Sequence, residues 1–507
     1  MISLVTLTLA LAAISAPDSL APASVAELRT LPAATALERL SDTSEATAFL
    51  KAEQTLRAGR AQEAQALAQA FETTYPGSIL TYRARLVEAW SSLALGDHRH
   101  GCQILSEVAR GTDRGASAQA RETVKEWVKS GKLSAEAMLS LPSDFPVSDS
   151  LSGQLATMFS QTYGSSPLIV LLPSTGPYAS IGKRVARGAL LAAEDAKVKA
   201  IQIDEPSDPI EAALLVRGML RVTRPRAVVG PLLSNTSVTV AQEMARFAPE
   251  VPLLLPTATS PGVSRLSPWA WQVNVTTAQQ GVEAARRARK CLNASEAYLI
   301  WPKGEFGDAV SQGFRDEFER LGGRIAWQRS YAAGNTDFRA TLESLRKSAS
   351  ELARRRGQDT TKLAPLVFSP GENPTEAAAL AGQASSLGMK PQWLGASGWH
   401  SRQFLIESTG RMDGTIVVTD NIPDETRPTW KSFSQKWRSA GLDAPDRLAA
   451  LGWDAAQLAL LPKLPPASVF VGAQGDIEFD PAGRNNDKVE VLQVEKGAFV
   501  AYTCPAR

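Results

Sequence analysis

The segment 168–193 constrains the fold of this 507-residue chain more than any other. It reads LIVLLPSTGPYASIGKRVARGALLAA, an apolar run followed by a Pro/Gly/Ser turn and then by apolar residues at helical spacing. The apolar run Leu168–Leu172 is typical of a strand buried on both faces. Ile181, Val185 and Ala189 then recur with the period of a helix. Such a strand–loop–helix unit places its loop at the carboxyl edge of a parallel sheet, where open α/β folds bind ligands.

The turn in this segment is a poor match to a phosphate-binding loop. That loop needs two glycines separated by four residues, followed by Lys and then Ser or Thr. Here five residues separate Gly176 from Gly182, and Lys183 is followed by Arg184. The spacing therefore argues against a nucleotide site.

Strand-like and helix-like segments alternate from residue 166 onwards. The clearest helix is Glu305–Leu321, with a single apolar stripe. Alternation over about 340 residues predicts an α/β fold of parallel sheets in two lobes, because one sheet of that length would be too large. Closure into a barrel is the alternative, although the strands that end the chain without helices are unusual for a barrel. The candidate strands are Leu168–Leu172, Ile201–Asp204, Ala227–Gly230, Leu253–Leu255, Ala297–Trp301, Leu366–Phe368, Thr415–Thr419, Ile477–Phe479 and Val489–Val494.

Residues 24–145 are rich in Ala, Leu, Glu and Arg and predict an all-α domain. Three helix–turn–helix corners contain Gly59, Gly96 and Gly131, which lie 37 and 35 residues apart. This spacing resembles the tetratricopeptide repeat, whose period is about 34 residues. A generic helical bundle is the alternative. The Ser-rich stretch 146–165, which begins with Pro146, is predicted to be a linker.

An apolar block, Leu4–Ala16, lies near the start of the chain. It is too short for a stable membrane span and suits the central region of a signal peptide over residues 1–23, with cleavage after Ala23. An N-terminal core helix is the alternative. No cysteine lies near this site, so a lipid anchor is not indicated. We therefore expect a periplasmic or otherwise exported chain without a later membrane span.

Charge and residue types exclude several function classes. The 54 basic and 52 acidic residues give a formal net charge of +2, which argues against nucleic-acid binding. The three histidines, His98, His100 and His400, make a His-based triad or metal site hard to assemble. The segment Gly395–Trp399 lacks the final glycine of a nucleophile elbow. We expect no enzyme activity, no cofactor and no metal.

The chain has three cysteines, Cys102, Cys291 and Cys504. In an exported protein Cys291 and Cys504 could pair, and Cys102 is expected to be a small buried residue.

Eight short motifs occur in order beyond residue 166. They are Thr175–Gly182, Val229–Ser237, Pro256–Pro261, Gly304–Gly307, Asn335–Phe338, Leu394–Trp399, Leu451–Ala455 and Gly475–Asp480. With these motifs, residues 166–507 resemble the type I periplasmic binding proteins of the leucine/isoleucine/valine class. The resemblance implies two lobes that close over a ligand about a three-strand hinge. It places the hinge crossings near Thr276, Asp413 and Gln474, which assigns 166–276 and 414–474 to the first lobe, and 277–413 and 475–507 to the second.

The resemblance also implies a set of ligand-binding residues. The first lobe offers Ser234, Asn235, Thr257, Ala258 and Thr259, whose hydroxyls and backbone N–H groups at helix starts suit a carboxylate. The second lobe offers Phe306, Ser397 and Trp399. Ser234 and Asn235 have a structural alternative as helix caps, and the threonines as turn residues. Phe306 has one as the first residue of the apolar stripe of its helix, and Trp399 lies either exposed on a loop or packed between the lobes.

The sequence departs from the amino-acid-binding members in the second lobe. Those members place an acidic residue around Ser397 to receive the α-ammonium group, whereas this loop reads Ala396-Ser397-Gly398. Burial of an unpaired ammonium is costly. At Phe306 the family often has tyrosine. A standard amino acid is therefore less expected than the fold alone suggests, and a neutral, carboxylic or aromatic ligand, or no ligand, is an open alternative.

Two functions remain. The leading interpretation is an exported solute receptor that captures a small molecule, an amino acid or a related carboxylate, for an ABC transporter or a sensor. The alternative is a scaffold that resembles the penicillin-binding-protein activators, which combine tetratricopeptide-like repeats with this fold and act on peptidoglycan synthases by protein contact. In either case the helical region is expected to bind protein.

Overall fold

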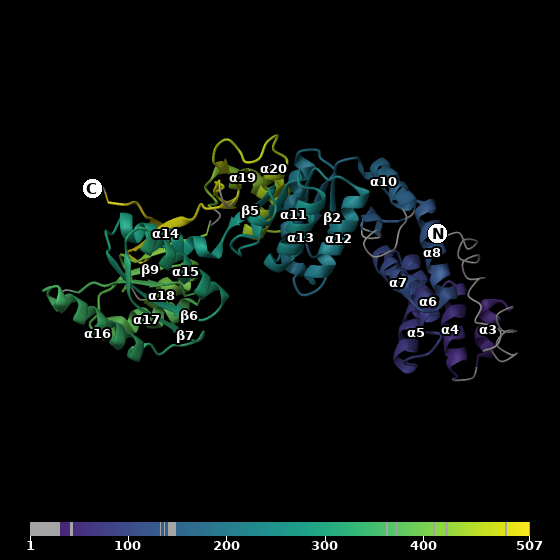
Figure 1. The fold of residues 1–507 in the computed structure, drawn as a ribbon, viewed down its shortest axis with the longest axis horizontal. Coiled ribbons are helices and arrows are strands. Elements are labelled where there is room, and N and C mark those ends of the chain that lie inside the picture. The colour runs from purple at the N-terminus through teal and green to yellow at the C-terminus, as the bar shows by residue number, and fades with distance from the viewer. Residues whose placement is uncertain are drawn as a thin grey trace. The chain divides into compact units, whose positions relative to one another are not determined.

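Figure 1 shows the computed structural model of the chain. The described residues are 31–40, 44–131, 133–135, 137–139, 149–360, 363–371, 373–408, 411–420, 424–481 and 484–505. The signal peptide predicted over residues 1–23 therefore lies outside them. The chain divides into two compact units. One contains residues 1–169, 198–226 and 242–251, and the other contains 170–197, 227–241 and 252–507.

The described residues up to 131 form helices joined by short turns, as the predicted helical region requires. Each helix packs on the next along the chain from α4 to α8. The helices are α3 (Ala33–Arg39), α4 (Glu45–Arg57), α5 (Ala61–Thr74), α6 (Thr81–Leu95), α7 (His98–Arg110) and α8 (Arg114–Ser130). Gly59, Gly96 and Gly131 follow helix ends with φ of 80°, 88° and 68°. This left-handed backbone is one that glycine adopts at low cost, so the helix corners lie at the predicted glycines. Whether the hairpins are tetratricopeptide repeats stays a prediction.

The stretch 146–165 is not the simple linker that its composition suggested. Residues Asp149–Tyr163 form a helix, α10, whose Leu155 and Phe159 are buried. This helix packs on α12 (Pro209–Val222). In the same compact unit, Arg99 of α7 places its Nη1 3.4 Å from the Oδ2 of Asp204. Leu155 and Phe159 are four residues apart, which is the spacing of a helix face. The many serines around them made the segment look like a linker.

A six-stranded sheet has the order β13-β5-β4-β3-β1-β2. This sheet and the helices that pack on it are called the first lobe. Its strands are β1 (Leu168–Leu171), β2 (Ala200–Ile203), β3 (Ala227–Val229), β4 (Leu253–Leu255), β5 (Ala270–Val275) and β13 (Asn485–Asn486). The pairs β3–β4, β4–β5 and β5–β13 are parallel. The first-lobe helices are α11 (Ala179–Asp195), α12, α13 (Ser234–Phe247), α19 (Pro428–Ser439) and α20 (Arg447–Ala459). Two short antiparallel strands, β11 (Phe470–Val471) and β12 (Asp476–Ile477), follow α20.

A seven-stranded sheet, the second lobe, has the order β15-β14-β10-β9-β8-β6-β7. Its strands are β6 (Glu296–Pro302), β7 (Arg324–Tyr331), β8 (Leu366–Ser369), β9 (Gln392–Gly395), β10 (Ile416–Thr419), β14 (Glu490–Glu495) and β15 (Ala498–Ala501). Its helices are α14 (Thr277–Lys290), α15 (Glu305–Arg320), α16 (Arg339–Arg355), α17 (Pro374–Ser386) and α18 (Arg402–Ser408). The α/β fold with a preceding helical region is thus confirmed, and with two separate sheets the barrel alternative is wrong.

Alternate residues of the second-lobe strands enter two different cores. Leu299 and Phe368 pack with Phe314 of α15, whereas Ile300 and Val367 pack with Leu345 of α16. Because successive side chains of a strand point to opposite faces, a central strand covered on both sides must be apolar throughout. Helices α14 and α15 therefore cover one face, and α16 and α17 cover the other (Figure 1).

Two of the three predicted hinge crossings are wrong. Strand β10, which was assigned to the first lobe, pairs with β9 and β14 of the second. The crossing expected near Asp413 therefore lies after Thr419. Conversely, β13 pairs with β5 of the first sheet, so the crossing expected near Gln474 lies between Asn486 and Glu490. The first crossing follows β5, since α14 begins at Thr277 and packs on α15.

A disulfide joins Cys291, directly after α14, to Cys504 near the end of the chain. This is the pairing that the sequence allowed. Cys102 is buried in the helical region, outside the disulfide.

Candidate functional site

The first-lobe part of the candidate site is built on the loop that follows β3. Gly230 ends this strand with φ of 111°. A Cβ at this position would lie 1.9 Å from the carbonyl oxygen of Leu171, so only glycine fits here. The chain then turns directly into α13, which begins at Ser234. A backbone approach this close brings the start of a helix to the carboxyl edge of the sheet.

The structure brings Ser234 and Thr259 together from two different loops. The Oγ of Ser234 accepts hydrogen bonds from the backbone N–H groups of Thr259 and Ser260, both at 3.3 Å. The neighbouring Thr257 donates from its Oγ1 to the carbonyl oxygen of Leu232 at 2.6 Å. The loops after β3 and β4 are therefore held side by side by hydroxyl groups, as expected from the parallel pairing of their strands.

Asn235 and Ala258 take different places. Asn235 is exposed, and its Oδ1 accepts from the backbone N–H of Thr236 at 2.9 Å. Ala258 is fully buried, and its carbonyl oxygen accepts from the Nε2 of Gln272 at 3.2 Å. The Oε1 of Gln272 also accepts hydrogen bonds from Ser264. The buried amide of Gln272 on β5 therefore holds the loop that follows β4.

Neutral donors dominate this first-lobe cluster. The hydroxyl of Ser234, which accepts two N–H groups, still has its own hydrogen to donate at the start of α13, where the helix dipole adds partial positive charge. The chemistry of such a cluster suits a carboxylate, whose oxygens accept hydrogen bonds without a full counter-charge.

The second-lobe residues are held by α14 and α15. The backbone N–H of Ser397 donates to the Oε1 of Gln280 at 2.9 Å, and Gln280 is buried in α14. Phe306, the second residue of α15, is half-buried and packs against the core that contains Phe314. Ser397 is half-buried, so its hydroxyl and Phe306 remain candidates for ligand contact.

Trp399 does not fit the role that the sequence suggested. Its side chain is 0% exposed, and its ring lies 5.8 Å from that of Trp393 and 5.1 Å from that of Phe404. A Cβ on Gly395 would lie 2.6 Å from the same indole. Trp399 is therefore a core residue, and we remove it from the candidate set. The neighbouring His400 packs on Phe499 at 4.5 Å, and burial lowers its pKa.

An acidic residue that the sequence reasoning missed lies at the same edge of the second sheet. Asp420 directly follows β10, and β10 pairs in parallel with β9, whose loop contains Ser397. The Oδ2 of Asp420 lies 2.6 Å from the Nη2 of Arg447, which also donates to Asn274 at 3.0 Å. The sequence signal for this position was a polar pair, Thr419-Asp420, at the end of an apolar strand. It was overlooked because β10 was assigned to the other lobe.

Neither a metal-binding cluster nor a membrane-spanning helix is found in the described part of the chain. There, no group of three or more His, Cys, Asp or Glu side chains could hold a metal ion. Nor does any helix among the described residues have the length and apolar character needed to cross a membrane.

Comparison with known proteins shows the family of this chain. Residues 169–461 match the family model described as periplasmic binding protein. An amino acid binding protein of Pseudomonas aeruginosa is 23% identical over 282 residues, which cover 54% of this chain and 71% of that protein. The Leu/Ile/Val-binding protein BraC3 of Rhizobium johnstonii is 24% identical over 275 residues, covering 51% of this chain and 68% of that protein.

A solved structure supports the fold. A protein from Rhodospirillum rubrum, described as a branched-chain amino acid ABC transporter, is 21% identical with a TM-score of 0.56. The match covers 66% of this chain and 100% of that one. The resemblance seen in the eight motifs is confirmed, and the chain belongs to the periplasmic binding protein family.

Proposed function

We propose that this chain is an exported solute-binding protein that captures a small carboxylate, an amino acid or a related acid, for an ABC transporter or a sensor. The observation that carries the proposal is the hydroxyl cluster of the first lobe, in which Ser234 at the start of α13 is bonded to the backbone of Thr259, and Thr257 to the backbone of Leu232. Export is supported by the family and by the apolar block at residues 4–16.

The relatives and the second-lobe residues together indicate the ligand class. The relatives named above are amino acid and Leu/Ile/Val-binding proteins. In this chain the loop of Ser397 has no carboxylate, and the nearby Asp420 is already paired with Arg447. An ammonium group would have to compete with that guanidinium for Asp420. A carboxylate ligand without an α-ammonium group therefore binds at a lower free-energy cost than a standard amino acid.

A thermal-shift screen of the full chain tests the proposal. Amino acids and small carboxylic acids, aliphatic and aromatic, are added singly, and a ligand present at 100 times its Kd should stabilise the protein by about 2.7 kcal/mol. The double variant Ser234→Ala/Thr259→Ala should lose this shift. The matched control Thr73→Ala/Thr74→Ala, which removes two exposed hydroxyls from α5, should keep it. If the Ser234→Ala/Thr259→Ala variant keeps the thermal shift, the ligand binds elsewhere.

The second candidate function is a scaffold of the cell envelope, and the helical region favours it. Helices α4–α8 form successive hairpins, and Arg99 of α7 is paired with Asp204. A screen without any shift, combined with capture of a purified peptidoglycan synthase by the full chain, would favour the scaffold over the receptor. Weaker capture by an Arg85→Ala/Arg121→Ala variant would locate the contact in the helical region.

A further inference from the structure

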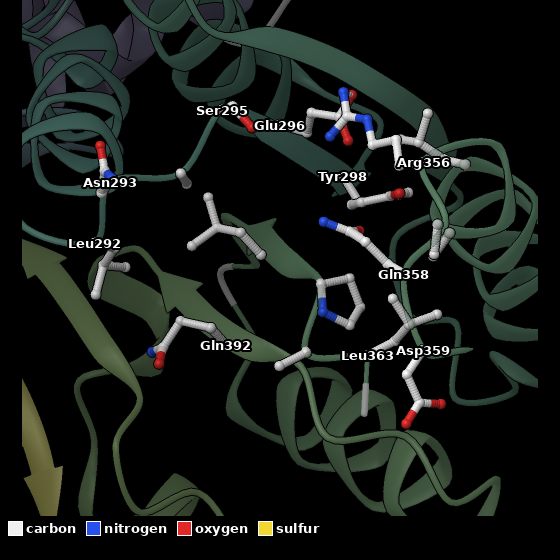
Figure 2. A pocket seen from close by; sticks show the side chains of 17 residues that line it. Leu292, Asn293, Ser295, Glu296, Tyr298, Arg356, Gln358, Asp359, Leu363 and Gln392 are labelled. Atoms are coloured by element: carbon white, nitrogen blue, oxygen red, sulfur yellow. Dashed lines mark hydrogen bonds and ion pairs between the residues drawn. The ribbon is translucent and has the colours of Figure 1, made fainter. Parts of the chain in front are cut away.

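The second lobe contains a cavity of about 550 Å³ that is remote from the candidate site (Figure 2). Glu296, Leu366 and Gln392 line it, and they are the first residues of β6, β8 and β9. These three strands are parallel neighbours. The cavity therefore opens at the amino edge of the sheet, whereas Ser397 and Asp420 lie beyond its carboxyl edge. Its volume lies in the range of small-ligand sites.

Glu296, which lines this cavity, is compensated by two arginines. The Oε1 of Glu296 accepts from the Nη2 of Arg356 at 2.8 Å and from the Nε of Arg324 at 3.1 Å. The side chain of Glu296 is only 12% exposed. Asp359, at the rim, is exposed. A cationic ligand would compete with the two guanidinium groups for Glu296, and an anionic ligand would compete with Glu296 for Arg356, which is costly where the carboxylate is this buried.

Neutral hydrogen-bonding groups make up the rest of the polar lining. They are Asn293, Ser295, Tyr298, Gln358 and Gln392. Figure 2 shows the side chain of Gln358 reaching into the cavity. Burial, with the nearby charge of Glu296, raises the pKa of Tyr298 to about 12, so its hydroxyl keeps its proton at neutral pH. Gln392 donates from its Nε2 to the carbonyl oxygen of Gly414 at 2.8 Å, which fixes the orientation of its amide.

Apolar side chains complete the cavity. Leu352 from α16 lies on one side, and Pro365 and Leu366 lie at the start of β8. A ligand that fits this lining presents hydroxyl or amide groups on its edges and C–H groups on its faces. A sugar ring has this chemistry, since every hydroxyl both donates and accepts while the ring faces are apolar.

We propose that this cavity is a second ligand site, which binds a neutral saccharide at the amino edge of the second-lobe sheet. The site is independent of the proposed function, because it shares no residue with the hydroxyl cluster of the first lobe. For ligands of this size the Kd is expected to be on the order of a millimolar.

Saturation-transfer NMR on the full chain tests the proposal with four related probes. D-glucose and N-acetyl-D-glucosamine are neutral, whereas D-glucuronate and D-glucosamine carry opposite charges. We expect transfer to the two neutral sugars and binding of the charged sugars that is weaker by about fivefold or more, because they disturb the paired charges. Absence of transfer to both neutral sugars overturns the proposal, and equal binding of all four overturns its ligand class.

Variants locate the binding. Gln358→Ala removes one hydrogen-bonding side chain from the exposed rim and should weaken the neutral sugars by about fivefold to tenfold. Tyr298→Phe removes only the hydroxyl and should act in the same direction. Leu352→Trp should fill the cavity and abolish binding. Retained binding in Leu352→Trp, with an unfolding midpoint like that of the parent, contradicts the assignment.

Two controls separate this site from the first. Gln161→Ala on α10 is exposed and should change nothing. The variant Ser234→Ala/Thr259→Ala should bind the neutral sugars like the parent protein. If this variant loses sugar binding, the sugars occupy the first-lobe site and the proposed second site is wrong.

Discussion

Asp454 shows how a single buried side chain shapes the structure near the lobe crossings. It lies on α20 with no exposure, and its Oδ1 and Oδ2 accept from the backbone N–H groups of Ala473 and Gln474 at 2.7 and 2.8 Å. A Cβ on Gly472 would lie 2.4 Å from Oδ2. The carboxyl group therefore holds the turn between β11 and β12 on the helix. Burial raises the pKa of Asp454 to about 7.

Asp454 should make the stability of this protein depend on pH. Because its pKa is higher in the folded chain than the ordinary 3.8, the folded state holds the proton more tightly, and stability falls as pH rises from about 4 to about 7. Asp454→Asn cannot titrate, so this part of the slope should vanish. It should also lower the free energy of unfolding at low pH by about 1–3 kcal/mol, since its NH₂ group faces one of the two N–H donors.

Urea unfolding between pH 4 and 8 measures both effects. The exposed substitution Asp316→Asn on α15 serves as the control and should keep the slope of the parent. An unchanged slope in Asp454→Asn would show that the carboxyl of Asp454 is already ionised throughout this range.

At the scale of elements, small residues set how closely helices approach. A Cβ on Gly188 of α11 would lie 2.0 Å from the carbonyl oxygen of Ala449, and one on Gly452 of α20 would lie 1.9 Å from that of Val185. The two helices therefore cross with their backbones in contact, through glycines that helix propensity alone would disfavour. This reciprocal packing fixes α20, and with it Asp454 and Arg447, on the first lobe.

Alanine substitution should affect the free energy of unfolding differently at two helical glycines. Gly188→Ala should destabilise the protein by about 1–3 kcal/mol, because the added methyl group meets backbone that cannot move alone. Gly153→Ala on α10 has no heavy atom within 4 Å of the new Cβ, and should be neutral or stabilising by up to about 1 kcal/mol. Chemical denaturation measures both. Equal effects would mean that propensity, and not the close helix contact, governs position 188.

Some elements could be predicted from the sequence and others could not. Strands β1, β6, β8 and β10 are apolar on both faces, and their patterns were visible. Strand β5 was missed because its buried Gln272 and Asn274 look like loop residues, although Gln272 makes hydrogen bonds in the core. Strand β7 was missed because it lies at the sheet edge with Gln328 and Arg329 exposed.

At the scale of the whole molecule, one covalent bond joins distant parts of the second lobe. Cys291 directly follows α14 and Cys504 follows β15, with a sequence separation of 213 residues. A crosslink over so long a loop restricts the unfolded chain strongly. It ties the last strands, which return to the second sheet after the third crossing, to a helix at the start of that lobe.

Removal of this bond should destabilise the second lobe. Cys504→Ser should lower the free energy of unfolding by about 2–4 kcal/mol. Dithiothreitol should lower the melting temperature of the parent protein and leave that of Cys504→Ser unchanged, which differential scanning calorimetry can measure. A reductant effect that persists in the variant would point to a different pairing.

What the sequence alone determined is local. Apolar periodicity marked the strand–loop–helix unit at 168–193 and the two-sided strands, and glycines marked the corners of the helical region. Only the tertiary structure decided which sheet each late strand joins, because strand pairing is non-local: β10 pairs with β14, far along the chain. For the same reason the burial of Trp399 and the placement of Asp420 beside the loop of Ser397 emerged only from packing. Local pattern names the type of each element, but the neighbours that define a site are brought together by the fold.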